Sequence, residues 1–245
     1  MDKNETNILH MKRIAIIVAA GIGSRIQNAD AKTYVCKQLI SLNGKEIVAH
    51  TIDKFENSSK VDGIILVIGK DTKEDFSKLQ EKYQWKKIIS VVNGGAERQD
   101  SVFCGLEVLP ESTEIVLVHD GVRPFVSEKI ISNSVITAEK MGACVVGVPA
   151  KDTIKICNEK GLVESTPKRD SLWLVQTPQT FQKDILLRAY QNAKEKGISG
   201  TDDASLVEFM GVDVEVIYGS YSNIKITTQE DLFIGGVIAK KGGDK

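Results

Sequence analysis

A short loop near the start of the chain combines two glycines with an arginine. Residues 19–25 (AAGIGSR) follow the most apolar run of the sequence, and Lys37 and Gln38 come after a polar stretch. Glycines in such a loop let the backbone turn sharply and point its N–H groups at phosphate oxygens. A guanidinium and an ammonium nearby can neutralise a nucleoside triphosphate. The pattern therefore predicts phosphate binding, although taken alone it also fits a plain strand-to-helix turn.

Four further segments carry polar side chains that could share one site. Residues 93–102 (NGGAERQDSV) follow an apolar run and open a helix-like stretch, and residues 119–124 (HDGVRP) place a carboxylate beside a guanidinium. Residues 151–153 (KDT) begin a predicted hairpin that has Arg169 on its return, and residues 223–227 (NIKIT) place a lysine in a late apolar stretch. Each segment lies at or near an expected loop, where ligand-binding side chains concentrate.

Apolar runs alternate with helix-like stretches along most of the chain, which predicts a doubly wound, mostly parallel α/β sheet. We expect strands over residues 13–20, 63–68, 88–92, 115–119, 143–148, 214–218 and 224–227. We expect helices over residues 46–55, 73–83, 97–109, 128–141, 183–194, 203–210 and from 229, with Ser127 as the N-cap of the fourth. Ligands in such folds bind beyond the carboxyl ends of the strands, near the reversal of strand order. The loops that follow the strands are therefore the first place to look for a site.

One segment breaks the alternation. Residues 153–157 and 162–166 show period-two patterning around a turn at 158–161 that contains Asn and Gly, which predicts an antiparallel hairpin. A projecting hairpin has an apolar face to bury, either against a neighbouring subunit or against its own domain. We expect a flexible leader over residues 1–11 and a single domain over 12–240 with a β-arm at about 150–176.

Composition narrows the classes of partner. The chain has 32 Lys+Arg against 33 Asp+Glu and a formal net charge of −1, so no overall field favours nucleic acid or an anionic membrane. No apolar run is long enough to span a bilayer. The four cysteines are scattered without metal-binding spacing, which argues against disulfides or zinc and favours a reducing, cytoplasmic compartment.

The motifs taken together resemble one family. From about Lys12 to the last helix the chain carries A-A-G-x-G-x-R, K-Q, G-G-x-x-R-x-x-S-V, H-D-x-x-R-P, D-T-I-K, L-W-x-x-Q-T-P-Q-x-F, T-D-D-A-S and N-x-K-I-T, in that order. This set resembles the bacterial 2-C-methyl-D-erythritol 4-phosphate cytidylyltransferases of the isoprenoid route. The resemblance implies a Rossmann-like domain with a projecting β-arm, a homodimer through the arms, and transfer of CMP from CTP to a polyol phosphate. It also implies Mg²⁺, which arrives with CTP.

The resemblance also implies roles for individual residues. The expected catalytic residues are Arg25, Lys37 and Asp120, with Asp120 also the expected protein ligand of Mg²⁺. The expected nucleotide-binding residues are Ala19, Ala20, Gly21, Gly23, Gly95, Ala96 and Ser101. The expected acceptor-binding residues are Arg123, Thr153, Arg169 and Lys225, of which Thr153 and Arg169 would come from the partner's arm. Ser101 is also suited to a helix-capping role, and His119 is expected to be a core histidine.

Some positions depart from the family pattern. Ala96 stands where the family often has Asp, and Cys36 stands where Pro is common. Lys32 lies at the more usual spacing from the loop arginine and competes with Lys37 for the α-phosphate, whereas the neighbouring Gln38 favours Lys37.

Three alternative functions remain at this level. The ribitol-5-phosphate cytidylyltransferase branch shares the loop, the arm and the reaction. Residues 122–125 and 221–223 lean toward it, whereas residues 201–205 and 230–232 lean toward the methylerythritol branch, which we prefer. A dinucleotide-dependent oxidoreductase would need a third glycine where this chain has Ile26. A non-catalytic nucleotide-binding module would bind CTP without releasing pyrophosphate.

Overall fold

The central feature of the computed structural model, which describes residues 10–21 and 36–241, is a seven-stranded sheet in the order β11-β7-β10-β6-β1-β4-β5. Its strands are β1 (Arg13–Ala19), β4 (Gly63–Ile68), β5 (Ile88–Asn93), β6 (Ile115–Asp120), β7 (Ala143–Pro149), β10 (Trp173–Gln182) and β11 (Glu215–Tyr218). All neighbouring pairs are parallel except the two that β10 makes, with β6 and with β7. The prediction of a mostly parallel α/β sheet is confirmed.

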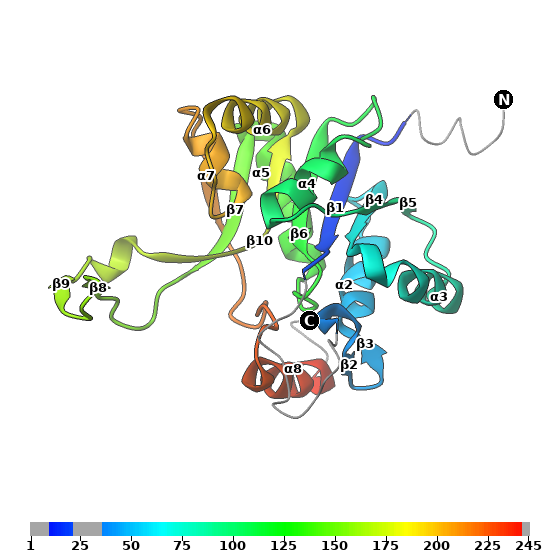
Figure 1. Cartoon of the computed structure of the whole chain (residues 1–245), viewed down its shortest axis with the longest axis horizontal. Helices are drawn as coiled ribbons and strands as arrows, with labels where there is room; N and C mark the ends of the chain where they lie inside the picture. Colours follow the sequence, from blue (N-terminus) through cyan, green and yellow to red (C-terminus); the bar gives the residue numbers. More distant parts are fainter. Residues whose placement is uncertain (1–9, 22–35, 242–245) are drawn as a thin grey trace.

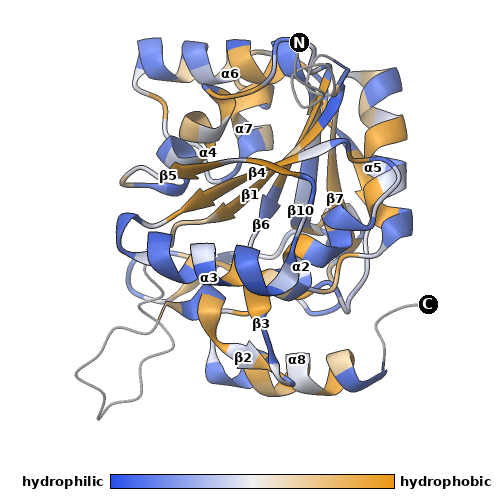
Figure 2. Ribbon diagram, turned by 90° about the vertical axis from the view of Figure 1, so that its right-hand side faces the viewer, coloured by the Kyte–Doolittle hydropathy of each residue, from blue (hydrophilic) through white to orange (hydrophobic). Residues whose placement is uncertain are grey.

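Helices cover both faces of this sheet (Figures 1 and 2). One face packs against α2 (Ile47–Glu56), α3 (Lys73–Tyr83) and α5 (Glu128–Met141), and the other against α4 (Arg98–Leu106), α6 (Lys183–Lys196) and α7 (Asp203–Glu208). Successive residues of β1 alternate between the two cores, Ile14 and Ile16 facing one and Ala15 and Ile17 the other. Both faces are buried, which explains why the strand reads as a continuous apolar run.

The reversal of strand order lies at β1. This strand pairs with β4 on one side and with β6 on the other, and Val18 lies opposite Asp120 in the register with β6. The backbone N–H of Gly121 donates to the carbonyl of Val18 at 2.8 Å. The loop after β1 and the carboxylate at the end of β6 therefore meet at the switch point, where α/β sheets of this kind bind ligands.

A third, smaller core lies beside the carboxyl ends of the strands. Here α8 (Gln229–Lys241) packs against the hairpin of β2 (Ser41–Leu42) and β3 (Lys45–Glu46), as Figure 2 shows. The 3-10 helix η1 (Lys37–Leu39) precedes this hairpin and contacts α2. Asn43 and Gly44 both have positive φ in the hairpin turn, the geometry that an Asn-Gly pair favours. The Asn43 side chain also donates to the carbonyl of Gly236 in α8 at 2.9 Å. The shared core is made of Leu42, Ile47, Val122, Phe125 and Ile226.

The predicted hairpin is present and stands away from the body of the molecule (Figure 1). It consists of β8 (Ile156–Cys157) and β9 (Val163–Ser165), joined by a turn in which the N–H of Gly161 donates to the carbonyl of Asn158 at 2.9 Å. Gly161 has φ +76°, so glycine suits this position. The 3-10 helix η3 (Arg169–Ser171) then returns the chain toward β10.

Three segments differ from the prediction, and the first is the hairpin of β2 and β3, where no strand was expected. The ten-residue β10 was not expected, because polar residues such as Gln176, Thr177 and Gln179 interrupt its apolar pattern; they are buried and hydrogen-bonded inside the sheet. Residues 224–227 were expected to form a strand but form none; the N–H of Ile226 donates instead to the carbonyl of Val122 in a loop. In the described part of the chain, no helix is long and apolar enough to cross a membrane.

Candidate active site

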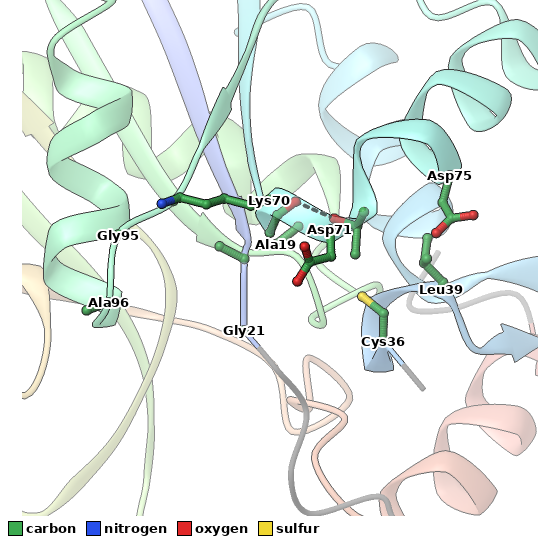
Figure 3. Close-up of a pocket in the computed structure, with 13 residues that line it drawn as sticks. Ala19, Gly21, Cys36, Leu39, Lys70, Asp71, Asp75, Gly95 and Ala96 are labelled. Carbon is green, nitrogen blue, oxygen red and sulfur yellow. Dashed lines mark hydrogen bonds between the residues drawn. The ribbon is translucent and has the colours of Figure 1, made fainter. Parts of the chain in front are cut away.

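A cavity of about 740 Å³ opens at the carboxyl ends of β1, β4 and β5 (Figure 3). Its lining is Ala19, Ala20, Gly21, Cys36, Leu39, Gly69, Lys70, Asp71, Thr72, Asp75, Gly94, Gly95 and Ala96. Five of the seven residues expected to bind the nucleotide are in this set, namely Ala19, Ala20, Gly21, Gly95 and Ala96. Gly23 lies outside the described residues, as do Arg25 and Lys32.

Small residues let the loops after β1 and β5 touch. A Cβ added to Gly94 would come within 2.4 Å of the Cβ of Ala20 and within 2.7 Å of the Ser101 hydroxyl oxygen. Real Cβ atoms do not approach so closely, so the contact between the two loops requires glycine at position 94. The wall that results is mostly backbone and methyl groups, which suits the flat face and polar edge of a base.

Ser101, the seventh expected nucleotide residue, lies behind the cavity wall. Its side chain is buried and its hydroxyl donates to the carbonyl of Glu97 at 3.0 Å, one turn earlier in α4. The N–H of Glu97 in turn donates to the Asp100 carboxylate at 3.1 Å. The hydroxyl thus bonds within the first turn of α4 and does not cap the helix, because the N-cap residue is Glu97.

A charged wall of the cavity was not assigned a role from the sequence. The 3-10 helix η2 (Lys70–Thr72) follows β4, and Figure 3 shows the Lys70 side chain extending toward Gly95. Asp71 and Asp75 add carboxylates to the same wall. The segment follows β4 directly and lies beside the glycine loop, and that position in the sequence could have indicated a role in ligand binding.

The Lys37-Gln38 pair is tied to the glycine loop. The buried amide of Gln38 donates to the carbonyl of Gly21 at 2.9 Å, and the Cys36 thiol donates to the amide oxygen of Gln38 at 2.9 Å. Burial raises the pKa of the Cys36 thiol above its ordinary value. Gln38 therefore holds η1, and with it Lys37, next to the loop after β1.

Asp120 is the centre of a buried charge cluster at the end of β6. Its Oδ1 faces Nε of Arg98 at 3.3 Å, while its Oδ2 faces Nε of Arg123 at 3.2 Å and Nζ of Lys225 at 3.0 Å. Burial works against the charged carboxylate, but the positive charges of Lys225, Arg98 and Arg123 outweigh it and hold the pKa of Asp120 well below its ordinary value. Asp120 is therefore ionised throughout the working range of pH. The structure thus brings together three of the expected residues.

Arg98 is also a member of this cluster. It is the arginine of the G-G-x-x-R-x-x-S-V motif, and no role for it was predicted from the sequence. Its Nη2 lies 2.8 Å from Oδ2 of Asp203, a residue 1 % exposed. Burial disfavours the guanidinium charge, but Asp203 and Asp120 more than compensate and raise the pKa of Arg98. Counted over the described residues, the cluster holds three cations against two carboxylates, a surplus of one positive charge that suits an anionic ligand.

Lys225 reaches the cluster from the irregular segment at 223–227. The buried side-chain amide of Asn223 donates to the carbonyl of Thr177 at 3.0 Å and to the amide oxygen of Gln176 at 3.1 Å. Nη1 of Arg123 donates to the carbonyl of Asn223 at 2.9 Å. Lys225 is thus placed by contacts to β10 and to the loop after β6, although its segment forms no strand.

His119 precedes Asp120 and is fully buried. Its Nδ1 lies 3.0 Å from the Thr177 hydroxyl and its Nε2 lies 3.1 Å from the carbonyl of Arg123. Burial lowers the pKa of His119 to about 4. The expectation of a core histidine with satisfied hydrogen bonds is confirmed.

The two remaining acceptor candidates lie on the arm. Thr153 and Arg169 are exposed, and Nη1 of Arg169 donates to the carbonyl of Lys151 at 3.2 Å. Because the arm projects from the body (Figure 1), these residues do not join the Asp120 cluster of their own chain.

The fit of Mg²⁺ at Asp120 is limited by the cations already there. Both carboxylate oxygens face positive groups, so a metal ion bound to Asp120 would have to displace one of them. Among the described residues, no three His, Cys, Asp or Glu side chains are placed to hold a metal ion.

Comparisons with known proteins point to one family. Residues 13–241 match the family model of 2-C-methyl-D-erythritol 4-phosphate cytidylyltransferase. The chain is 48 % identical over 230 residues to the protein of that name from Alkaliphilus oremlandii, covering 94 % of this chain and 95 % of the relative. It is also 48 % identical over 221 residues to the Clostridioides difficile protein of that name, covering 89 % and 90 %.

Solved structures show the same likeness. The crystal structure of 4-diphosphocytidyl-2C-methyl-D-erythritol synthase from Anaerococcus prevotii superimposes with a TM-score of 0.82 at 36 % identity, covering 96 % of this chain and 99 % of that one. The 2-C-methyl-D-erythritol 4-phosphate cytidylyltransferase of Francisella tularensis superimposes with a TM-score of 0.76 at 32 % identity, covering 92 % and 99 %.

Proposed function

The chain belongs to the 2-C-methyl-D-erythritol 4-phosphate cytidylyltransferase family, and we propose that its site transfers CMP from CTP to the phosphate of 2-C-methyl-D-erythritol 4-phosphate. The observation that carries this proposal is the juxtaposition of two features at the switch point. The first is the cavity, whose lining includes Ala19 at the end of β1. The second is the three-cation cluster centred on Asp120, which lies opposite Val18 of β1 in the sheet. A nucleotide in the cavity and a phosphate at the cluster would face each other.

The reaction needs charge stabilisation rather than a protein nucleophile. An oxygen of the acceptor phosphate attacks the α-phosphorus of CTP, a new P–O bond forms, and the bond to the β-phosphate oxygen breaks to release pyrophosphate. Negative charge accumulates around the α-phosphorus, so preorganised cations supply most of the catalysis. Lys225 and Arg123 hold the acceptor phosphate, and Asp120 orients both cations.

The cations for the triphosphate come from the other side of the site. Gln38 places Lys37 beside the glycine loop, where its ammonium serves the α-phosphate. Arg25, which lies outside the described residues, is assigned to the triphosphate by the family resemblance. Cytosine and ribose occupy the wall formed by Ala20, Gly95 and Ala96.

Magnesium enters as part of the substrate in this proposal. CTP binds Mg²⁺ through its phosphate oxygens, which supply most of the ligands that the ion prefers. Asp120 lies at the phosphate end of the site but holds cations on both oxygens, so its main task is to orient them. The four cysteines are free thiols, which supports work in a reducing compartment such as the cytoplasm.

A homodimer would complete the site by supplying Thr153 and Arg169 from the partner's arm. Support comes from the arm itself, whose apolar side chains Ile156, Leu162 and Val163 are all at least half exposed. A mixing experiment tests this arrangement. Arg169→Ala and Lys225→Ala proteins, each nearly inactive, should regain about a quarter of wild-type activity after subunit exchange, because half of the dimers carry one intact site. Absence of any recovery would refute a shared site.

The proposed reaction is tested by pyrophosphate release. Purified protein with CTP and Mg²⁺ is given 2-C-methyl-D-erythritol 4-phosphate, ribitol 5-phosphate or no acceptor. We expect release only with the first. Exclusive use of ribitol 5-phosphate would overturn the acceptor assignment, and CTP binding without release under any condition would indicate a binding module.

A further inference from the structure

Arg98 joins two carboxylates that belong to distant parts of the fold. It is the first residue of α4, and its guanidinium contacts Asp120 at the end of β6 and Asp203 at the start of α7. Its side chain is largely buried between them, at 29 % exposure. A planar guanidinium can serve two carboxylates at once from fixed directions, which an ammonium cannot do.

Asp203 is itself firmly anchored. Its Oδ1 accepts a hydrogen bond of 2.6 Å from the Tyr190 hydroxyl, and its backbone N–H donates to the amide oxygen of Gln179 at 2.9 Å. The same Gln179 oxygen accepts from the N–H of Ala204 at 3.0 Å, so β10 holds the first turn of α7. The anchored Asp203 carboxylate therefore fixes the position of the Arg98 guanidinium, and that guanidinium in turn orients the Asp120 carboxylate.

The distribution of cations over the two Asp120 oxygens is uneven. Among the residues that the structure describes, Arg98 is the one cation on Oδ1, while Arg123 and Lys225 share Oδ2. Without Arg98, Oδ1 would become the less neutralised oxygen, and the more exposed Lys225 could move its ammonium toward it. Displacements of about 1 Å at a reacting group can cost on the order of 100-fold in rate.

We propose that Arg98, anchored by Asp203, is a positioning residue that reserves Oδ1 of Asp120 and so keeps the heads of Arg123 and Lys225 directed at the acceptor phosphate. This role rests on the proposed function, because it assigns those two cations to the acceptor. It predicts a defect in the handling of the acceptor rather than of CTP. The nucleotide wall is held by other contacts, namely the approach of Gly94 to Ala20 and the hydrogen bond from Ser101 to Glu97.

The test compares four variants with the wild-type protein. Arg98→Gln removes the bridge, and Arg98→Lys keeps a positive charge without the bridging geometry. The double variant Arg98→Gln/Asp203→Asn removes the bridge without leaving a buried, unpaired carboxylate, which would itself destabilise the fold. Arg13→Gln is the matched control, since Arg13 also makes two contacts with carboxylate oxygens, both of them on Asp62, but at the opposite end of β1.

Three readouts are needed: KM for each substrate with kcat, the melting temperature, and calorimetric titration with 2-C-methyl-D-erythritol 4-phosphate. In Arg98→Gln and in the double variant we expect the acceptor KM to rise roughly 10- to 100-fold, with the CTP KM within about twofold of wild type. The double variant should be at least as thermostable as Arg98→Gln. Arg98→Lys should remain about tenfold impaired toward the acceptor. Arg13→Gln should lower the melting temperature and leave both KM values as they are.

Several results would overturn the role of Arg98. One is an acceptor KM in the double variant equal to that of wild type, and another is an equal change in the KM values of both substrates. A third is a wild-type acceptor KM in Arg98→Lys, which would show that the positive charge alone, without the bridging geometry, is sufficient. A wild-type protein that releases no pyrophosphate would instead refute the proposed function. In that case the calorimetric titration still decides about Arg98, through the loss or retention of phosphate affinity.

Discussion

Protonation of His119 should destabilise the fold by an amount that follows from its burial. The ring is fully buried, and in its neutral form it can accept from the Thr177 hydroxyl at Nδ1 while donating from Nε2 to the carbonyl of Arg123. The nearby charges are those of Asp120, Arg123 and Lys225, of which the two cations oppose a further positive charge. Burial and these cations explain why the folded protein resists protonation of this ring.

The sign and size follow from linkage. The pKa of His119 is about 4 in the folded protein against 6.5 ordinarily, so the unfolded chain takes up the proton first as the pH falls. The His119 contribution to the free energy of unfolding is thus intact above about pH 6.5 and declines below it, levelling off below about pH 4. Between about pH 7.5 and pH 5.0 the loss from this one group amounts to about 2 kcal/mol.

Urea unfolding at those two values of pH, at one protein concentration, measures this loss. Other groups also titrate between them, so the wild-type protein is compared with His119→Gln, which we expect to be less stable at both values. Its loss between pH 7.5 and pH 5.0 should be smaller than that of wild type by about 2 kcal/mol. Equal losses in the two proteins would refute the reasoning that this ring is buried in its neutral form.

Three further predictions concern the site. Gly94→Ala should raise the KM for CTP at least tenfold, because the new Cβ would collide with Ala20. Gly236→Ala is the control and should leave this KM unchanged, since no atom lies closer than 3.8 Å to its new Cβ. A Gly94→Ala protein with the wild-type KM for CTP would contradict the contact between the loops. Lys37→Ala should lower turnover about 100-fold and CTP affinity far less, as steady-state rates and CTP titration would show. If the Lys37→Ala protein turns over normally and the Lys32→Ala protein is inactive, Lys32 is the lysine that contacts the α-phosphate. Chelation of Mg²⁺ should abolish pyrophosphate release, and added Mg²⁺ should restore it; activity that persists in excess chelator would refute the magnesium proposal.

Much of the fold was predictable because its information is local. Strands buried on both faces read as apolar runs, and Ser127 caps α5 by accepting from the N–H of Ile130, as its position before an acidic first turn predicted. The hairpin of the arm could be predicted from a turn that contains Asn and Gly, flanked on both sides by residues with period-two patterning. By contrast β10 was missed, because buried polar residues such as Thr177 and Gln179 are hydrogen-bonded inside the sheet, and nothing along the chain announces their partners.

The same division holds for the site. The order of the motifs in the sequence was enough to indicate the glycine loop and the carboxylate of Asp120, and the resemblance of those motifs to a known family implied the reaction. Only the tertiary structure joined Arg98 to Asp203, 105 positions away, and brought Lys225 to Asp120 from a segment without strand pairing. Those contacts depend on the order of strands in the sheet and on which helix covers which face. The ion pairs join side chains that are far apart in the sequence, whereas sequence periodicity reports only on residues that are close together along the chain.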